Sequence, residues 1–141
     1  MLENGQNTKK LLVNFNFKMK IFAFIFARGG SKGIKNKNLF PIKNKPLIYW
    51  SIKRSIESKY VNYTWVSSND NKILKFSKKN KAKIIKRPSE LSKDNSSSES
   101  AWIHAINYIK KNYKIDLILG IQPTSPIRSK NDFDKAIKFF L

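Results

Sequence analysis

The strongest constraint on the fold is a run of seven apolar residues, 21–27, followed directly by a loop rich in glycine and lysine. An unbroken apolar run of this length is typical of a central strand that helices cover on both faces. It is far shorter than the roughly 20 residues that a membrane-spanning helix requires. The run therefore predicts the first strand of a buried parallel sheet.

Strand signals then alternate with helix signals along the rest of the chain. We expect further strands at 63–66, 82–85 and 116–121, a helix that opens at Pro46, and helices around 73–76, 101–110 and 132–141. This alternation predicts an α/β fold, an open and mostly parallel sheet with helices on both faces. Ligands of such sheets bind beyond the carboxyl ends of the strands, where the polar clusters of this sequence also fall.

The 141 residues suit a single domain, which we expect to begin at Met19. Residues 1–18 are polar at first and then combine apolar with polar residues in no regular period, and they are expected to be a poorly ordered extension. A signal peptide is the rival interpretation, but Lys18 and Lys20 interrupt the apolar stretch. The cytoplasm is therefore the expected compartment. The absence of cysteine excludes disulfide scaffolds and thiolate zinc sites.

The net charge of +20, from 29 Lys and Arg against 9 Asp and Glu, suggests a nucleic-acid ligand. Two observations weaken that interpretation. Lysines number 25 against 4 arginines, beside 15 Asn and 18 Ile, and an AT-rich coding sequence would produce this joint excess whatever the protein does. The lysines are also scattered, whereas nucleic-acid modules usually concentrate their charge. A solvated lysine surface is the plainer explanation, and we expect no nucleic acid and no membrane as partner.

The loop that follows the first predicted strand has the composition of a phosphate site. Its glycines allow a tight turn with backbone N–H groups pointing inward, and three cations surround it. These residues are Gly29, Gly30 and Gly33, with Arg28, Lys32 and Lys37. No Gly-Lys-Ser/Thr closes the loop and no G-x-G-x-x-G occurs in it, which argues against P-loop ATPases and dinucleotide-binding dehydrogenases. A basic turn without a ligand stays open as the alternative.

Four segments, in order, resemble the acylneuraminate cytidylyltransferase family, the CMP-sialic acid synthetases. Residues 25–34 (IFARGGSKGI), with Lys37 and Asn38, resemble the family's opening signature. Residues 45–52 resemble its first helix, and residues 87–98 its nucleotide-side loop. Residues 122–128, Q-P-T-S-P-I-R, resemble its hallmark Q-P-T-S-P-L-R. Four ordered matches across residues 19–134 indicate this family far more strongly than one glycine loop would.

The resemblance implies a Rossmann-like nucleotidyltransferase fold and the transfer of CMP from CTP to a nine-carbon α-keto acid sugar, with release of pyrophosphate and the help of Mg²⁺. It implies that Arg28 and Lys37 are catalytic and that Gln122 faces the acidic sugar. The residues that it implies in nucleotide binding are Arg28, Gly29, Gly30, Ser31, Lys37, Asn38, Arg87, Ser96 and Ser98. Ser125 and Arg128 are expected to shape the turn around them.

The chain departs from the family pattern at several places. Lys35 stands where the family has proline, and the second strand ends in Ser68-Asn69 rather than Thr-Asp, with Asp70 one residue later. Family members are also longer, so the resemblance implies that the metal-binding aspartates and the dimerising segment lie beyond residue 141. We therefore expect a C-terminally truncated fold that spans residues 19–141, no metal ligands within this chain and little turnover.

Two other functions remain open from the sequence: a cationic non-enzymatic protein that binds nucleic acid, and a nucleotidyltransferase for legionaminic or pseudaminic acid. His104, the single histidine, lies in a predicted helix beside apolar residues, so a structural role is expected for it. Trp50, Trp65 and Trp102 fall within helix or strand patterns and are expected in the core, not in a base-stacking platform.

Overall fold

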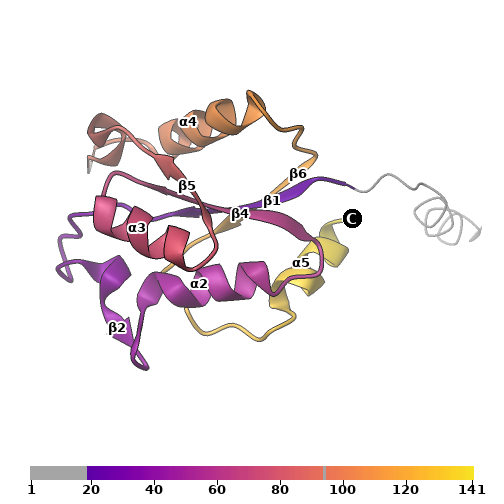
Figure 1. Cartoon of the computed structure of the whole chain (residues 1–141), viewed down its shortest axis with the longest axis horizontal. Coiled ribbons are helices and arrows are strands. Elements are labelled where there is room, and N and C mark those ends of the chain that lie inside the picture. The colour runs from indigo at the N-terminus through magenta and orange to yellow at the C-terminus, as the bar shows by residue number, and fades with distance from the viewer. Residues whose placement is uncertain (1–18, 94) are drawn as a thin grey trace, which may run out of the picture.

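The computed structural model describes residues 19–93 and 95–141 (Figure 1). The predicted extension, residues 1–18, lies outside the described residues. The strands are β1 (Ile21–Phe26), β2 (Pro41–Ile42), β3 (Lys45–Pro46), β4 (Val61–Ser68), β5 (Lys83–Lys86) and β6 (Leu117–Ile121). The helices are η1 (Lys37–Leu39), α2 (Leu47–Ile56), α3 (Asn71–Lys79), η2 (Ser89–Ser92), α4 (Ser98–Lys110) and α5 (Asp132–Phe140).

The main sheet has four strands in the order β5-β4-β1-β6, and every pairing in it is parallel. The chain passes from β1 outward to β4 and β5, and then returns to the other side of β1 as β6. The strand order therefore reverses between β1 and β6, which is where open α/β sheets place their ligand crevice. The predicted open parallel sheet is confirmed.

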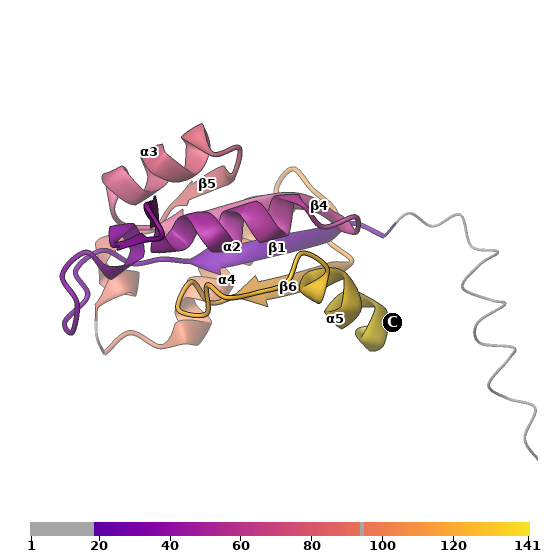
Figure 2. The same cartoon turned by 90° about the horizontal axis from the view of Figure 1, so that it is seen from below.

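Helices cover both faces of the sheet, as the apolar run of β1 predicted. Alternate residues of β1 point to opposite faces. Ala23 and Ile25 belong to a core cluster formed with α2, α3 and α5. Phe22 and Phe24 belong to a second cluster, formed with α4. Figure 1 shows α4 on one side of the sheet and α2 and α3 on the other, and Figure 2 shows α5 beside β6 on the side of α2.

A short antiparallel hairpin, formed by β2 and β3 with a two-residue turn, is the main element that the sequence did not indicate. Ile42 pairs with Lys45 in an antiparallel register, and the turn residues Lys43 and Asn44 both have positive φ, 47° and 62°. Both central residues of a type I′ turn adopt this conformation, usually as Asn-Gly. Lys-Asn is a weak signal for such a turn, so the hairpin went unpredicted. It precedes α2, with Pro46 at the N-cap position as expected.

A buried carboxylate fastens α5 to the end of α2. Asp134 is 7% exposed, and its Oδ1 accepts hydrogen bonds from the Ser58 hydroxyl at 2.5 Å and from the Lys59 backbone N–H at 3.1 Å. This contact joins segments 76 residues apart and holds α5 against the sheet.

Across residues 19–93 and 95–141, no helix is long and apolar enough to cross a membrane.

Candidate active site

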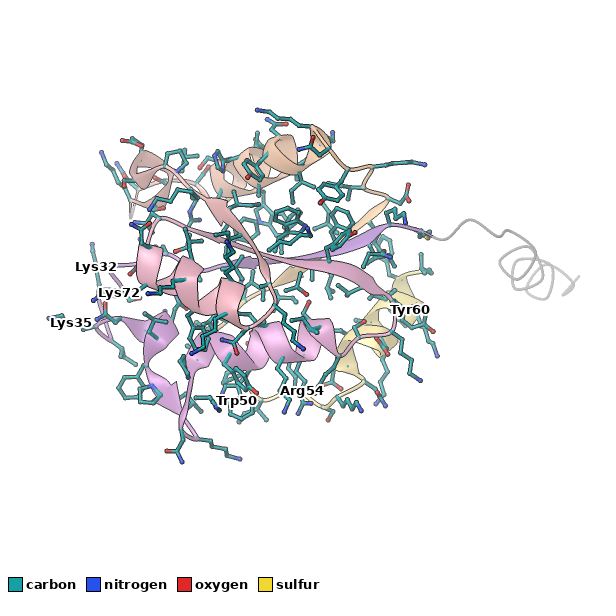
Figure 3. The ribbon with its side chains drawn as sticks, viewed as in Figure 1. Lys32, Lys35, Trp50, Arg54, Tyr60 and Lys72 are labelled. Carbon is teal, nitrogen blue, oxygen red and sulfur yellow. The ribbon has the colours of Figure 1, made fainter. Side chains whose placement is uncertain are left out.

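A cavity of about 680 Å³ opens at the carboxyl ends of β1 and β6, the point at which the strand order reverses. Three segments form most of its wall: the loop after β1, the first turns of α4, and the end of β6 with the residues that follow. Figure 3 shows Lys32 and Lys35 at this end of the molecule, opposite the end that carries Tyr60. The cavity therefore lies where the sequence predicted a ligand site.

Most residues that the sequence singled out line this one cavity. They come from segments that are far apart in the chain, and several follow strands of the same parallel sheet, whose carboxyl ends meet at one edge. The lining residues among them are Arg28, Ser31, Lys37, Asn38, Arg87, Ser98 and Gln122. Three others, Gly29, Gly30 and Ser96, do not line the cavity. The Ser96 hydroxyl instead donates a hydrogen bond of 2.6 Å to the Glu90 carbonyl within its own loop.

The loop after β1 is closed by Asn38. This residue is 5% exposed, and its side-chain Nδ2 donates a hydrogen bond of 2.9 Å to the carbonyl of Arg28. Gly30 has a φ of +70°, which L side chains rarely adopt, so glycine is required there. The amide of Asn38 and the turn at Gly30 together bring Arg28 and Lys37 to the same cavity.

Gly29 does not contribute the inward-pointing N–H group that the sequence led us to expect. Its backbone N–H donates a hydrogen bond of 2.9 Å to the side-chain oxygen of Asn69, in the loop after β4. A Cβ at Gly29 would lie 3.0 Å from Cβ and Oδ2 of Asp70, so this glycine also allows a close approach. Asp70 itself caps α3, since its carboxylate accepts from the backbone N–H groups of Lys72 and Ile73.

Arg87 is the most buried charged residue of the cavity, at 5% exposed. Burial lowers the pKa of its guanidinium, and the positive charge of Arg28 lowers that pKa further. Its Nε is buried and has no hydrogen-bond partner within the described residues. Arg28 approaches from the side of η2, where its Nη1 donates to the Ser92 carbonyl at 3.4 Å. Two neighbouring guanidinium groups in a partly dehydrated cavity favour an anionic or strongly accepting ligand.

One wall of the cavity is aromatic, and the sequence did not indicate it. Phe26 and Trp102 both line the cavity, with ring centroids 4.6 Å apart. Trp102 was expected in the core only; it packs against the α4 cluster and also faces the cavity, so that expectation was incomplete. Trp65 is 6% exposed and does belong to the core. Trp50 is half-buried on α2, where its Nε1 donates to the Ile42 carbonyl (Figure 3).

Arg128 shapes the turn after β6, as expected. Its Nη2 donates to the carbonyl of Gln122 at 2.9 Å, and its Nη1 donates to the hydroxyl of Ser51 at 3.1 Å. Arg54 of α2 donates in turn to the Arg128 carbonyl at 3.0 Å. These hydrogen bonds attach the Q-P-T-S-P-I-R segment to α2, and they hold the backbone at Gln122, which lines the cavity.

The cavity residues do not form a magnesium site by themselves. Magnesium prefers carboxylate oxygens, and among the described residues none that lines the cavity is acidic. The described part of the chain also holds no group of three or more His, Cys, Asp or Glu residues arranged for a metal. His104 lies in α4 but is not among the lining residues, and its Nδ1 is buried without a partner in the described part. No catalytic step is therefore assigned to a metal here.

The open parallel sheet, the basic glycine loop after its first strand and the cavity at the reversal of strand order define an open α/β protein with its candidate ligand site beyond the carboxyl ends of the strands. Comparison with known families narrows this class. Residues 22–140 match the family model described as Cytidylyltransferase, so the chain belongs to the cytidylyltransferase family.

Individual relatives agree with this assignment. The chain is 36% identical over 118 residues to N-acylneuraminate cytidylyltransferase A of Danio rerio, covering 84% of this chain and 27% of that protein. It is 34% identical over 125 residues to pseudaminic acid cytidylyltransferase of Campylobacter jejuni, covering 87% of this chain and 54% of that protein. The chain thus spans between about a quarter and about half of the length of these relatives.

A solved structure supports the fold. CMP:2-keto-3-deoxy-manno-octonic acid synthetase complexed with CTP superposes with a TM-score of 0.72 at 21% sequence identity, covering 86% of this chain and 47% of that one. The Rossmann-like nucleotidyltransferase fold that the sequence resemblance implied is therefore confirmed.

Proposed function

We propose that this chain is the CTP-binding part of an enzyme that transfers CMP from CTP to a nine-carbon α-keto acid sugar of the N-acylneuraminate type. One observation carries the proposal. Arg28, Arg87 and Gln122 follow three different strands, β1, β5 and β6, and all three line the same cavity. The cavity combines cations for a triphosphate with exposed polar groups for a base and a sugar acid.

The proposed reaction is a displacement at the α-phosphorus of CTP. The anomeric hydroxyl oxygen of the sugar forms a bond to this phosphorus, and its proton is released to solvent. The bond from the phosphorus to the bridging oxygen of the β-phosphate breaks, and pyrophosphate leaves with that electron pair. Catalysis of such a transfer rests mainly on positioning the reactants and neutralising phosphate charge.

Five residues of the cavity have a role in this proposal. Arg28 and Lys37 hold the triphosphate and stabilise the charge on the departing pyrophosphate. The orphaned Nε and the fork of Arg87, together with Ser98, bind the acceptor groups of the cytosine and ribose. Gln122, exposed at the end of β6, hydrogen-bonds the sugar acid. Glycines 29 and 30 shape the loop that carries Arg28.

A second substrate of the same class, pseudaminic acid, is favoured by the similarity to the Campylobacter jejuni enzyme. Cytidylyltransferases generally use a divalent metal, and we propose that Mg²⁺ is that metal. Because CTP is an intracellular nucleotide, we place the reaction in the cytoplasm. The alternative of a non-enzymatic nucleic-acid-binding protein is not favoured by the family assignment.

Thermal protection of the full chain tests the proposal. CTP at about 100 times its Kd should stabilise the folded chain by about 2.7 kcal/mol, a rise in Tm of several degrees. ATP and random-sequence DNA should protect much less, and Arg87→Ala should abolish the protection by CTP. Equal protection by DNA that disappears at moderate salt would instead indicate non-specific binding to phosphates.

A further inference from the structure

Gly120 is the fourth of the five residues of β6, and the ring of Trp102 occupies the space that its side chain would fill. A Cβ built there would lie 2.5 Å from Cη2 and 2.7 Å from Cζ2 of Trp102. Gly120 is not among the residues with positive φ, so its backbone would accept any side chain. The indole of Trp102, and not the backbone conformation of residue 120, therefore requires glycine at this position.

Two phenylalanine rings of β1 hold the indole of Trp102 in place. Phe24 packs edge-on against it at 6.1 Å between centroids, and Phe26 lies tilted against it at 4.6 Å. Phe24 is 1% exposed and belongs to the core cluster beneath α4, so the indole rests on a rigid support. Trp102 itself stays partly exposed, and Phe26, Trp102 and Gly120 all line the cavity. The exposed part of the indole is therefore a preformed apolar wall of the ligand site.

The position of this wall relative to the polar groups indicates which part of a ligand it contacts. Trp102 follows Ser98 by four residues on α4, so both lie on the same face of the helix. Gly120 belongs to β6, and Gln122 follows directly after the last residue of that strand, Ile121. The indole therefore shares the cavity with Ser98 of its own helix and with Gln122 after β6, whereas the lining residues Lys32 and Lys37 belong to the loop after β1.

A flat apolar surface suits the neutral aromatic part of a nucleotide and does not suit a triphosphate. We propose that Trp102, admitted by Gly120 and supported by Phe26, is a nucleoside-binding residue against which the pyrimidine ring of the bound nucleotide packs. Bases bind to proteins in this way when an aromatic side chain meets the π-face and polar groups meet the ring edge. This inference rests on the proposed function, because it assumes that the cavity binds a cytidine nucleotide.

The decisive experiment separates the aromatic ring from the volume that it fills. In the double variant Trp102→Leu/Gly120→Leu, the leucine at 120 fills the space that the indole leaves, without an aromatic ring. Kd values are measured by calorimetry on the full chain for CMP and for inorganic pyrophosphate. We expect CMP to bind about tenfold more weakly to the double variant, and pyrophosphate to bind within about twofold of the wild type.

Trp50→Phe is the matched control, since Trp50 lies outside the cavity; its CMP affinity should equal that of the wild type. Wild-type affinity for CMP in the folded double variant would overturn the proposal, because filled volume alone would then suffice. If the double variant does not fold, fluorescence decides. CMP should quench the wild type and Trp50→Phe but not Trp102→Phe, and an undiminished quench in Trp102→Phe would overturn the proposal.

These outcomes differ from failure of the proposed function. A wild-type chain that binds neither CTP nor CMP would overturn the proposed function, and this inference with it. A wild-type chain that binds both, beside a double variant that binds CMP equally well, would overturn the role of Trp102 alone.

Discussion

The backbone N–H of Gly29 donates a 2.9 Å hydrogen bond to the side-chain oxygen of Asn69, across 40 residues of sequence. This contact fastens the glycine-rich loop after β1 to the loop after β4. It explains how the glycine-rich loop is held although Ser68-Asn69 stands at the end of β4, where the family pattern has Thr-Asp. Asn69 acts on the loop through its amide oxygen, while Asp70 caps the next helix.

Removing the Asn69 amide should loosen the loop and weaken nucleotide binding. Asn69→Leu should leave the Gly29 N–H without its acceptor and cost about 1 kcal/mol of stability. We expect CTP affinity to fall several-fold, because the loop that carries Arg28 loses one fixed point. Asn69→Asp keeps an acceptor oxygen and should bind CTP better than Asn69→Leu. Urea unfolding and calorimetry measure the two effects, and equal CTP affinity in both variants would contradict this role.

Arg87 should favour ligand binding at the expense of the stability of the free protein. Its guanidinium is buried with an orphaned Nε beside the charge of Arg28. Arg87→Met should therefore leave the free chain equally stable, or about 1 kcal/mol more stable, and should abolish protection by CTP. Lys93→Met, at an exposed lysine, is the control and should change neither property. Thermal unfolding with and without CTP measures both, and a strong loss of stability in ligand-free Arg87→Met would contradict the argument.

Asp134 should matter for stability far more than its neighbour Asp132. Asp134→Ala removes the buried acceptor of the Ser58 hydroxyl and the Lys59 N–H, so we expect a loss of about 2–3 kcal/mol. Asp132 accepts an exposed hydrogen bond from the Ser129 N–H, so Asp132→Ala should cost less than about 1 kcal/mol. Urea unfolding of both variants tests the difference. Equal losses would show that the contact between α2 and α5 contributes little.

Asp116 should make stability depend on acid pH. The pKa of its carboxyl lies below its usual value, first because the Lys20 backbone N–H donates to it at 2.8 Å and also because Lys114 lies 3.3 Å away. A carboxyl with a lowered pKa in the folded state stabilises the fold above its unfolded pKa, about 3.9, and that contribution is lost as the pH falls through the folded value. The wild type should therefore be more stable than Asp116→Asn at pH 7.

The difference between the wild type and Asp116→Asn should shrink as the pH is lowered below about 4. Unfolding by urea at pH 7, 4 and 2.5 measures this trend. Lys114→Met keeps the hydrogen bond from Lys20 and should retain most of the pH dependence, since that bond is the largest cause of the lowered pKa. A difference that stays constant from pH 7 to pH 2.5 would rule out the assigned role.

Local patterns in the sequence were sufficient for the sheet and for much of the cavity. The alternation of apolar strands and amphipathic helices determined a parallel sheet, because each such segment can bury its apolar side only against the others. Once that sheet is given, its carboxyl ends lie at one edge. Arg28, Arg87 and Gln122 follow three of these strands, so their convergence on one cavity was predictable from their places in the sequence.

The tertiary structure alone decided the contacts that depend on strand order and on packing. The β5-β4-β1-β6 order brings Asn69 to Gly29, and the packing of α4 on β6 brings Trp102 against Gly120. Neither pair has a local signal, because its members are distant in sequence and each residue alone fits several environments. The sequence by itself thus determined which loops carry the polar groups, while only the packed structure determined that Asn69 holds the Gly29 N–H and that the Trp102 ring faces the cavity.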